Sequence, residues 1–430
     1  MAESVVEIVK KHLTREVLCA FVLFLGISGC DSPPPKFAPN RLFIERMARG
    51  EGADLEVAAP DIAQALEDWF GTPDQPKWPQ ILQTEEFAGL VDVDRLGRAA
   101  GQVRSDENDV HYGLYREHCV NCHSQEGNGR GPTSVFLNPY PRDFRPGIYK
   151  FKATAIGRKP TRADLRRTLV NGIVGTSMPS FQLLKSDDIE ALLDYLVYLS
   201  VRGEVERALI AEAAFELDAG DRFYAPELSD RDPDRFAEQR EVIEDVILEV
   251  AGDWQDSFVE ETVAPEPPEG VPAFAVDSSG RIEDAALRAS IDRGREIYLG
   301  EVANCASCHG KTGVGDGPTK DYDFWTKEWT TSLGLDPADR DAIEPLLDLG
   351  ALKPRVISPR DLRAGIYRGG GQPSDIYSRI VNGIEGSPMP AVAMQPDNPR
   401  GLTELEVWDL VNYVLSLPHE QLELLSGASE

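Results

Sequence analysis

Apolar positions recur at helical spacing in two widely separated segments. One is "DDIEALLDYLVYLS" at residues 187–200, and the other is "LTELEVWDLVNYVLSLP" at residues 402–418. A spacing of three to four residues places the apolar side chains on one face of a helix. The sequence therefore predicts two amphipathic helices, with these apolar positions: Ile189, Leu192, Leu193, Leu196 and Leu199 in one, and Leu405, Trp408, Val411 and Leu415 in the other.

A third apolar stripe lies between them, in "RFAEQREVIEDVILEVAGDWQDSFVEE". Its members are Val242, Ile243, Val246, Ile247, Val250, Trp254 and Phe258. The stripe predicts a long acidic helix that packs by this face. The stretch "VAPEPPEGVPAF" follows it, and its prolines favour an extended linker.

The two helical segments close two copies of one longer pattern. In order, the copies share "CVNCH" and "CASCH", "GNGRGPT" and "GVGDGPT", "PRDFRPGIYKF" and "PRDLRAGIYRG", and "LVNGIVGTSMPSF" and "IVNGIEGSPMPAV". Four matching blocks in one order indicate a module that is used twice. The second copy is longer between its first and third blocks, which predicts an inserted surface loop at about residues 320–357.

The repeat predicts the domain organisation of the chain. Residues 31–110 show little periodicity, and we expect them to wrap over a module surface. The predicted parts are a signal segment at 1–29, an N-terminal extension at 30–105, a first domain at 106–202, an acidic helical and Pro-rich linker at 203–285, and a second domain at 286–420.

The first thirty residues have the features of an export signal. Lys10, Lys11 and Arg15 precede the apolar run "VLCAFVLFLGI", which is short for a membrane span and leads to Cys30. The "ISGC" ending resembles a bacterial lipoprotein box. That resemblance implies cleavage before Cys30, acylation of this cysteine and a lipid tether on the periplasmic side of a bacterial membrane. A short uncleaved anchor is the alternative, and both place the body of the protein outside the cytoplasm.

The chain is strongly acidic. Its 430 residues include 44 basic and 73 acidic side chains, a net charge of −29, which argues against a nucleic-acid binder. Residues 201–290 alone contain 24 acidic and 8 basic side chains. Such a segment is either a solvated surface or a charged face for a partner, and the sequence leaves both open.

The pattern CxxCH occurs once in each copy, and it is the attachment pattern of c-type haem. Two thiols at this spacing can each add to one vinyl group of a porphyrin, and the next residue is then placed to bind the iron. The candidates are Cys119, Cys122 and His123 in the first copy, and Cys305, Cys308 and His309 in the second. Zinc is the alternative for a C-x-x-C pair, but it needs four ligands. No further cysteine or histidine repeats between the copies, since His111, His118 and His419 have no counterparts.

Methionine does repeat, although the chain has only five. Met178 and Met389 occupy equivalent places in "GTSMPSF" and "GSPMPAV". A thioether is a good ligand for haem iron, and Met/His ligation raises its reduction potential. We therefore predict Met178 and Met389 as axial ligands. Met394 is a weaker alternative in the second copy, because the first copy has no equivalent.

Together these motifs make each copy resemble a class I cytochrome c. The resemblance covers about half of the chain and implies a mostly α fold with two tandem helical domains. It implies two covalently bound c-type haems. It also implies that the Gly-Pro after each CxxCH supplies a backbone carbonyl to the axial histidine, at Pro132 and Pro318.

The repeated arginines of the "PRD" blocks are a separate candidate. Arg142, Arg145, Arg360 and Arg363 could pair with haem propionates. Surface Arg–Asp pairs are the alternative.

The predicted function is single-electron transfer, outside the cytoplasm, between respiratory donor and acceptor proteins. By analogy, the partners are membrane-associated redox proteins such as an oxidase or a quinol-oxidising complex. A methionine candidate in each copy leaves neither iron with an open position, so we predict an electron carrier rather than an enzyme. A dihaem peroxidase, which needs one iron with an open position, is the alternative; a haem-bearing sensor or assembly factor is a third hypothesis.

Overall fold

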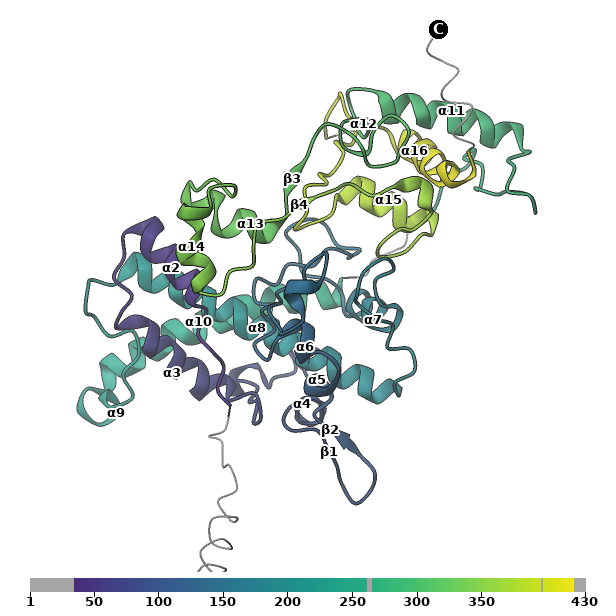
Figure 1. Ribbon diagram of the computed structural model, residues 1–430. Coiled ribbons are helices and arrows are strands. Elements are labelled where there is room, and N and C mark those ends of the chain that lie inside the picture. The colour runs from purple at the N-terminus through teal and green to yellow at the C-terminus, as the bar shows by residue number, and fades with distance from the viewer. Residues whose placement is uncertain (1–34, 261–264, 396, 421–430) are drawn as a thin grey trace, which may run out of the picture. The chain divides into compact units, whose positions relative to one another are not determined.

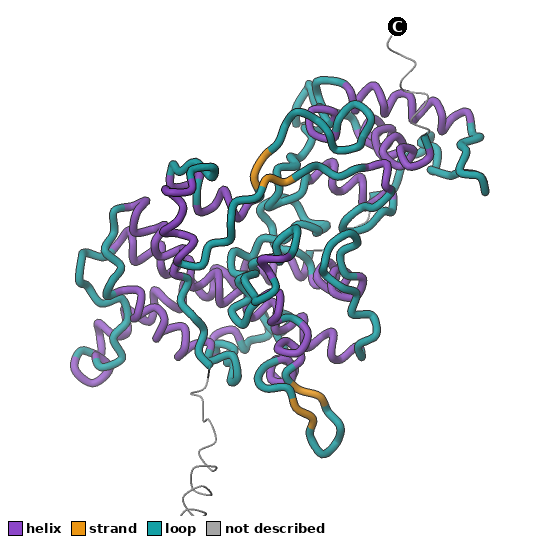
Figure 2. The backbone as a smooth tube through the Cα atoms, in the orientation of Figure 1, coloured by secondary structure: helices purple, strands orange, loops and turns teal. Residues whose placement is uncertain are grey.

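The computed structural model describes residues 35–260, 265–395 and 397–420. The predicted signal at 1–29 and Cys30 lie outside these residues. Helices and loops dominate the described chain, and strands occur as two short pairs (Figures 1 and 2). This confirms the mostly α fold class. Within the described ranges, no helix is both long enough and apolar enough to cross a membrane.

The elements follow one another in this order. The first part contains α2 (Arg41–Glu51), α3 (Ala58–Phe70), η1 (Gln80–Leu82), α4 (Val93–Ala99), β1 (Arg104–Ser105), β2 (His111–Tyr112), α5 (Leu114–His118), α6 (Val120–His123), η2 (Ser134–Phe136), α7 (Arg162–Asn171), α8 (Ser186–Glu216), α9 (Leu228–Arg231) and α10 (Pro233–Val259). The second part contains α11 (Ala285–Leu299), α12 (Ala306–His309), β3 (Asp321–Tyr322), α13 (Phe324–Trp329), η3 (Thr331–Leu333), α14 (Arg340–Asp348), β4 (Val356–Ile357), η4 (Leu362–Ala364), α15 (Pro373–Asn382), α16 (Glu404–Ser416) and η5 (Leu417–His419). Both strand pairs are antiparallel.

The first module is built around α8. Its predicted apolar stripe is present, because Ile189, Leu192, Leu193 and Leu199 are buried. The helix is longer than the stripe, since it continues to Glu216 and buries side chains as far as Ala213. The core of this module therefore extends past residue 202, the predicted end of the domain.

The predicted acidic helix is present as α10, which runs beside α8 (Figure 1). Ile243, Ile247 and Trp254 are buried in the same cluster as the α8 side chains. The acidic residues occupy the remaining faces of the helix, so its composition hides a contribution to the core. Residues 233–259 are part of the packing of the first module as well as the path to the second.

The N-terminal segment also contributes to this core. α2, α3 and α4 each pack on α8, and Leu66, Phe70, Leu90 and Leu96 are fully buried. We expected residues 31–110 to cover a surface. Instead, three helices supply interior side chains, which the many prolines, glycines and short helices of this segment conceal from a periodicity analysis.

The second module has a smaller core formed by α11, α15 and α16. α11 crosses α16 so closely that a Cβ placed on Gly294 would lie 2.1 Å from the carbonyl oxygen of Asp409. Only glycine permits this approach. Tyr298 of α11 and Tyr413 of α16 are buried with their ring centroids 5.1 Å apart, and Trp408 and Val411 of α16 are buried in the same core.

The insertion in the second module is an ordered element that contacts the first module. It contains β3, α13, α14 and β4, and its Trp329 and Leu346 share a small core with Leu42 of α2. Arg355 donates hydrogen bonds to the carbonyl oxygens of Leu137 and Val135. The insertion therefore packs against the first module and is not a free surface loop.

Candidate functional site

Each CxxCH motif forms one helical turn. The amide of His123 donates to the carbonyl of Cys119 at 2.8 Å, and the amide of His309 donates to Cys305 at 2.9 Å. This turn presents two thiols and an imidazole together. All four described cysteines are free. Burial raises the pKa of the Cys119 thiol to about 12 and that of Cys305 to about 11, so both thiols are protonated at neutral pH.

The Gly-Pro segments pack directly behind these turns. The amide of Gly131 donates to the carbonyl of Cys122 at 3.0 Å, and Gly317 donates to Cys308 at 3.1 Å. A Cβ on Gly131 would lie 2.4 Å from the carbonyl oxygen of Asn121, and the space at Gly317 is equally tight. Glycine is therefore required in both copies.

The axial histidine candidates are held by a different carbonyl from the one we predicted. His123 Nδ1 lies 2.9 Å from the carbonyl oxygen of Arg142, and His309 Nδ1 lies 3.1 Å from that of Arg360. The predicted carbonyl role of Pro132 and Pro318 is therefore wrong in this structure. The Gly-Pro segments lie against the back of the motif turn, whereas the main chain at Arg142 and Arg360 lies beside the imidazole rings.

This bond fixes the chemistry of each imidazole. A carbonyl only accepts, so Nδ1 carries the proton and Nε2 has a lone pair available for a metal. Burial lowers the pKa of His123 to about 4 and also lowers the pKa of His309. Both rings are therefore neutral at pH 7, as a metal ligand must be.

The loops that carry Met178 and Met389 have the same hydrogen bonds. The amide of Ile173 donates to the carbonyl of Met178 at 3.1 Å, and Ile384 donates to Met389 at 3.0 Å. Each turn is closed by a hydroxyl. Thr176 donates to the carbonyl of Ile173, and Ser387 donates to that of Ile384, both at 2.7 Å.

Met394 belongs to a different local structure. It forms an isolated bridge with Leu402, and its side chain packs against the core of the second module. The loop at Met389, rather than this one, corresponds to the loop at Met178. The structure therefore favours Met389 as the ligand candidate.

Arg145 and Arg363 form hydrogen bonds and ion pairs within the protein. Arg145 is buried and donates through Nε and Nη2 to Asp143 at 2.9 and 2.7 Å. Arg363 donates to the carbonyls of Thr312, Leu417 and Glu420 and to the Glu420 carboxylate. Their predicted pairing with propionates is therefore not supported. Arg145 does pair with an aspartate, but in the interior rather than at the surface.

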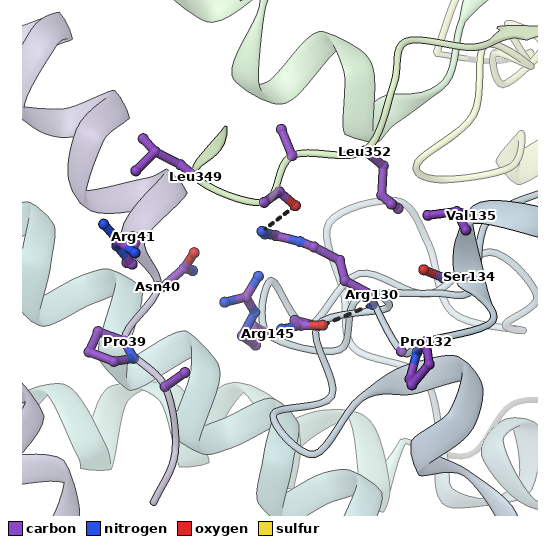
Figure 3. Close-up of a pocket in the computed structure, with 15 residues that line it drawn as sticks. Pro39, Asn40, Arg41, Arg130, Pro132, Ser134, Val135, Arg145, Leu349 and Leu352 are labelled. Carbon is purple, nitrogen blue, oxygen red and sulfur yellow. Dashed lines mark hydrogen bonds between the residues drawn. The ribbon is translucent and has the colours of Figure 1, made fainter. Parts of the chain in front are cut away.

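Arg145 and Pro132 line a pocket that also includes residues 38–41 and residues 349–352 of the insertion (Figure 3). Arg130 also lines it and donates through Nη1 to the carbonyl oxygen of Gly350 in the insertion, at 2.9 Å. None of the pocket-lining residues is a cysteine, histidine or methionine. This pocket is separate from the candidate ligand sets.

The zinc alternative finds no further ligands. Among the residues that the structure describes, no group of three or more histidine, cysteine, aspartate or glutamate side chains could hold a metal ion. Each module offers two thiols for attachment, and one neutral imidazole and one thioether as possible iron ligands. That combination fits a covalently attached haem.

The comparison with family models decides the family. The model described as cytochrome c matches residues 112–200 and 291–418, which together make up half of the chain. This chain belongs to the cytochrome c family. It is accordingly a haem electron-transfer protein, and the family implies covalently bound c-type haem. The two matched segments coincide with the two modules of this cytochrome c.

Among solved structures, this cytochrome c is similar to a chain of the Kuenenia stuttgartiensis reducing HAO-like protein complex. The two are 23% identical, and the alignment covers 74% of this chain and 99% of that chain with a TM-score of 0.41. No curated protein matches the sequence.

Some residues of these sites escape sequence reasoning. The carbonyls of Arg142 and Arg360 hold the imidazoles, and Phe144 stacks on His123 with ring centroids 4.6 Å apart. The repeated "PRD" block marks these positions in both copies. It points to the arginine side chains, however, and gives no sign that the main chain takes part.

Proposed function

We propose that this cytochrome c carries two haems, one per module, and transfers single electrons. The observation that carries the proposal is the repeated set of groups: each module has a neutral, half-buried histidine held by an arginine carbonyl, two free thiols beside it, and a methionine loop with the same hydrogen bonds. The site residues are Cys119, Cys122, His123 and Met178 for the first haem, and Cys305, Cys308, His309 and Met389 for the second.

The chain's own groups have distinct roles in this proposal. The thiols would attach the porphyrin through its vinyl groups, and the imidazole Nε2 and the methionine sulfur would hold the iron. The carbonyls of Arg142 and Arg360 fix the ring orientation and raise the basicity of each imidazole. When bound, each haem supplies an iron that gains and loses one electron. Thr176 and Ser387 hold the methionine loops in shape.

The two methionine loops support an electron carrier rather than an enzyme. An iron with ligands on both faces has no open position for a substrate. Because Met178 and Met389 sit in loops of the same construction, neither module is distinguished as a catalytic one. A dihaem peroxidase would require one of these sulfurs to be absent or to leave readily.

The cellular setting is also part of the proposal. The lipoprotein-like "ISGC" at Cys30 supports export, acylation and a membrane tether on the periplasmic side. Covalent haem attachment after export agrees with this setting. The partners would be membrane-associated redox proteins, and the net charge of −29 disfavours nucleic acid.

The test is a haem count combined with ligand spectroscopy on the exported protein. A pyridine haemochrome measurement should give two haems per chain. The oxidised protein should show the near-infrared methionine-to-iron charge-transfer band at the intensity of two centres, with slow binding of cyanide and no reaction with peroxide. A high-spin haem that reacts with peroxide would favour the peroxidase alternative and contradict the proposed carrier.

A further inference from the structure

The two modules contact each other through corresponding parts of the repeat. We define the arginine segments as residues 141–150 and 359–368, and the methionine loops as residues 172–178 and 383–389. Each arginine segment lies against the methionine loop of the other module. Both contacts are within the part of the chain that the structure describes.

The first contact joins the arginine segment of module one to the methionine loop of module two. A Cβ placed on Gly386 would lie 2.9 and 3.2 Å from the two Nη atoms of Arg142, and 3.4 Å from Cγ2 of Ile148. The neighbouring Glu385 forms an ion pair with Lys152 and accepts a hydrogen bond from the amide of Gly157. The second methionine loop is therefore held by residues of the first module.

The second contact has the same construction in the opposite direction. A Cβ placed on Gly175 would lie 3.3 Å from Cγ2 of Ile366 and 3.6 Å from Nη1 of Arg360. Arg368 donates through Nη2 to the carbonyl oxygen of Gly175 at 3.1 Å. The first methionine loop is therefore contacted by the arginine segment of the second module.

These contacts are reciprocal. Arg142 and Arg360 occupy the same position of the repeat, as do Ile148 and Ile366, and Gly175 and Gly386. When residue i contacts j and the counterpart of j contacts the counterpart of i, the pairing has the logic of a two-fold interface. Two independent sets of atoms thus show one arrangement, in which a guanidinium of each module faces the other module's ligand loop.

Arg142 and Arg360 each touch both sites. The carbonyl oxygen of Arg142 accepts from His123 in its own module, while its guanidinium lies against the loop of Met389. Arg360 holds His309 by its carbonyl and reaches the loop of Met178. One residue therefore connects the histidine of one site to the methionine loop of the other.

An arginine guanidinium stays charged in a protein at neutral pH, so both side chains carry a fixed positive charge. Burial lowers the pKa of Arg142 to about 10, which still leaves it charged at pH 7. Burial also lowers the pKa of Arg360. A fixed positive charge in a poorly solvated position disfavours the oxidised, more positive state of a nearby iron, because Coulomb interactions are strong where water is excluded.

We propose that the two arginines act across the modules: the Arg142 side chain raises the potential of the second haem, and the Arg360 side chain raises that of the first. This rests on the proposed function, because it requires a haem at each site. Both arginines are positioning residues that tune the centres, and together they couple the two potentials. The proposal concerns the side chains only, since the carbonyls serve the histidines of their own modules.

The test compares Arg142→Leu with Arg360→Leu by spectroelectrochemical titration of the purified two-haem protein. Both variants keep the backbone carbonyl. Each haem is assigned in a Met178→His or Met389→His background, which removes the methionine-to-iron band of one known centre. We expect Arg360→Leu to lower the potential of the Met178 centre more than that of the Met389 centre, and Arg142→Leu to do the reverse.

Controls separate this inference from the proposed function. Arg142→Lys and Arg360→Lys keep the charge. The haem potentials of these variants should therefore stay close to those of the wild type, unlike those of the Leu variants. Arg116→Leu, at a residue paired with Asp74 outside the contact, should shift neither centre. A larger shift of the centre in the arginine's own module, or no shift, would overturn the cross-module inference alone. Loss of the methionine band from wild type would instead contradict the proposed function.

Discussion

The two modules hold the same ligand pattern in different surroundings. In the first, Phe144 stacks on His123, and the core includes side chains from α2 to α10. In the second, Leu362 stands where the first has Phe144, and the core is formed by side chains between Leu287 and Leu417. What both share is the CxxCH turn, the tight glycine behind it, the histidine–carbonyl bond and the methionine loop. These are the features that the ligand site requires, whereas the surrounding packing is free to differ.

Removing a methionine should have the largest effect and should act on one module at a time. In Met178→Ala or Met389→Ala, the haem stays attached through its thioethers, but the iron loses its sulfur ligand. The potential of that centre should fall by a substantial part of the roughly 0.8 V range that axial ligands span, and half of the near-infrared band should disappear.

Met394→Leu is the matched control, because this side chain packs against the core of the second module. It should leave both bands and both potentials unchanged. If Met394→Leu removed a band while Met389→Ala did not, the ligand of the second module would be Met394.

The second prediction concerns the larger core of the first module. Trp254 of α10 is fully buried, and its indole Nε1 donates to Glu204 at 2.7 Å. Trp254→Ala should lower the free energy of unfolding of the first module by about 3–5 kcal/mol. Denaturant titration monitored by the Met178 band, in a Met389→Ala background, reports this module. Val242→Ala on the same helix is 37% exposed and should change it by less than about 0.5 kcal/mol.

If the two helix variants behaved alike, α10 would be a linker rather than part of the core.

The sequence predicts only part of the fold of the first module. The apolar stripes of α10 and of the first half of α8 are visible in the sequence, but nothing local shows that α8 continues to Glu216.

The third prediction compares equivalent aspartates of the two modules. Asp143 is buried with Arg145, whereas Asp361 is exposed. Asp143→Asn would leave the Arg145 charge without its counter-ion and should destabilise the first module by about 3 kcal/mol. Asp361→Asn should change stability by less than about 0.5 kcal/mol. The site is exposed, and the side-chain oxygen of asparagine can still accept the hydrogen bond from the backbone N–H of Arg363.

The same pair predicts a pH dependence. Burial alone would raise the pKa of Asp143, but the charge and hydrogen bonds of Arg145 outweigh it, so this pKa lies below its ordinary value of 3.8. The pair therefore stabilises the first module above that value, and its contribution is lost as the pH falls through the lower folded pKa. Acid unfolding of Asp143→Asn that matched wild type would show that the pair contributes nothing.

The smallest expected effect concerns the insertion. Arg355 bonds two carbonyls of the first module and lies 3.6 Å from the ring centroid of Tyr140. Arg355→Ala should weaken this contact by about 1–3 kcal/mol. Hydrogen exchange of residues 321–357 should become faster, with unchanged haem potentials. Lys353→Ala, which removes an exposed side chain but keeps its carbonyl for Tyr140, should leave exchange as in wild type.

The sequence predicted the ligand candidates because attachment chemistry requires fixed spacing. Cys305, Cys308 and His309 must share one helical turn, and Met389 recurs at its place in the repeat. The carbonyl that holds His309 lies 51 residues away at Arg360, beyond the insertion, and a backbone carbonyl carries no residue-type signal. For the same reason, the contact of Arg142 with the loop of Met389 could not be predicted, since it depends on how two modules pack.

In the proposed electron carrier, both modules hold iron between histidine and methionine. A redox titration of the wild-type protein, followed at the near-infrared methionine-to-iron band, shows whether both do. We expect the band to be lost in two steps of equal amplitude, one haem each, because the ligands are the same and the surroundings differ. A band worth one centre, with a second haem that titrates without any near-infrared change, would contradict it.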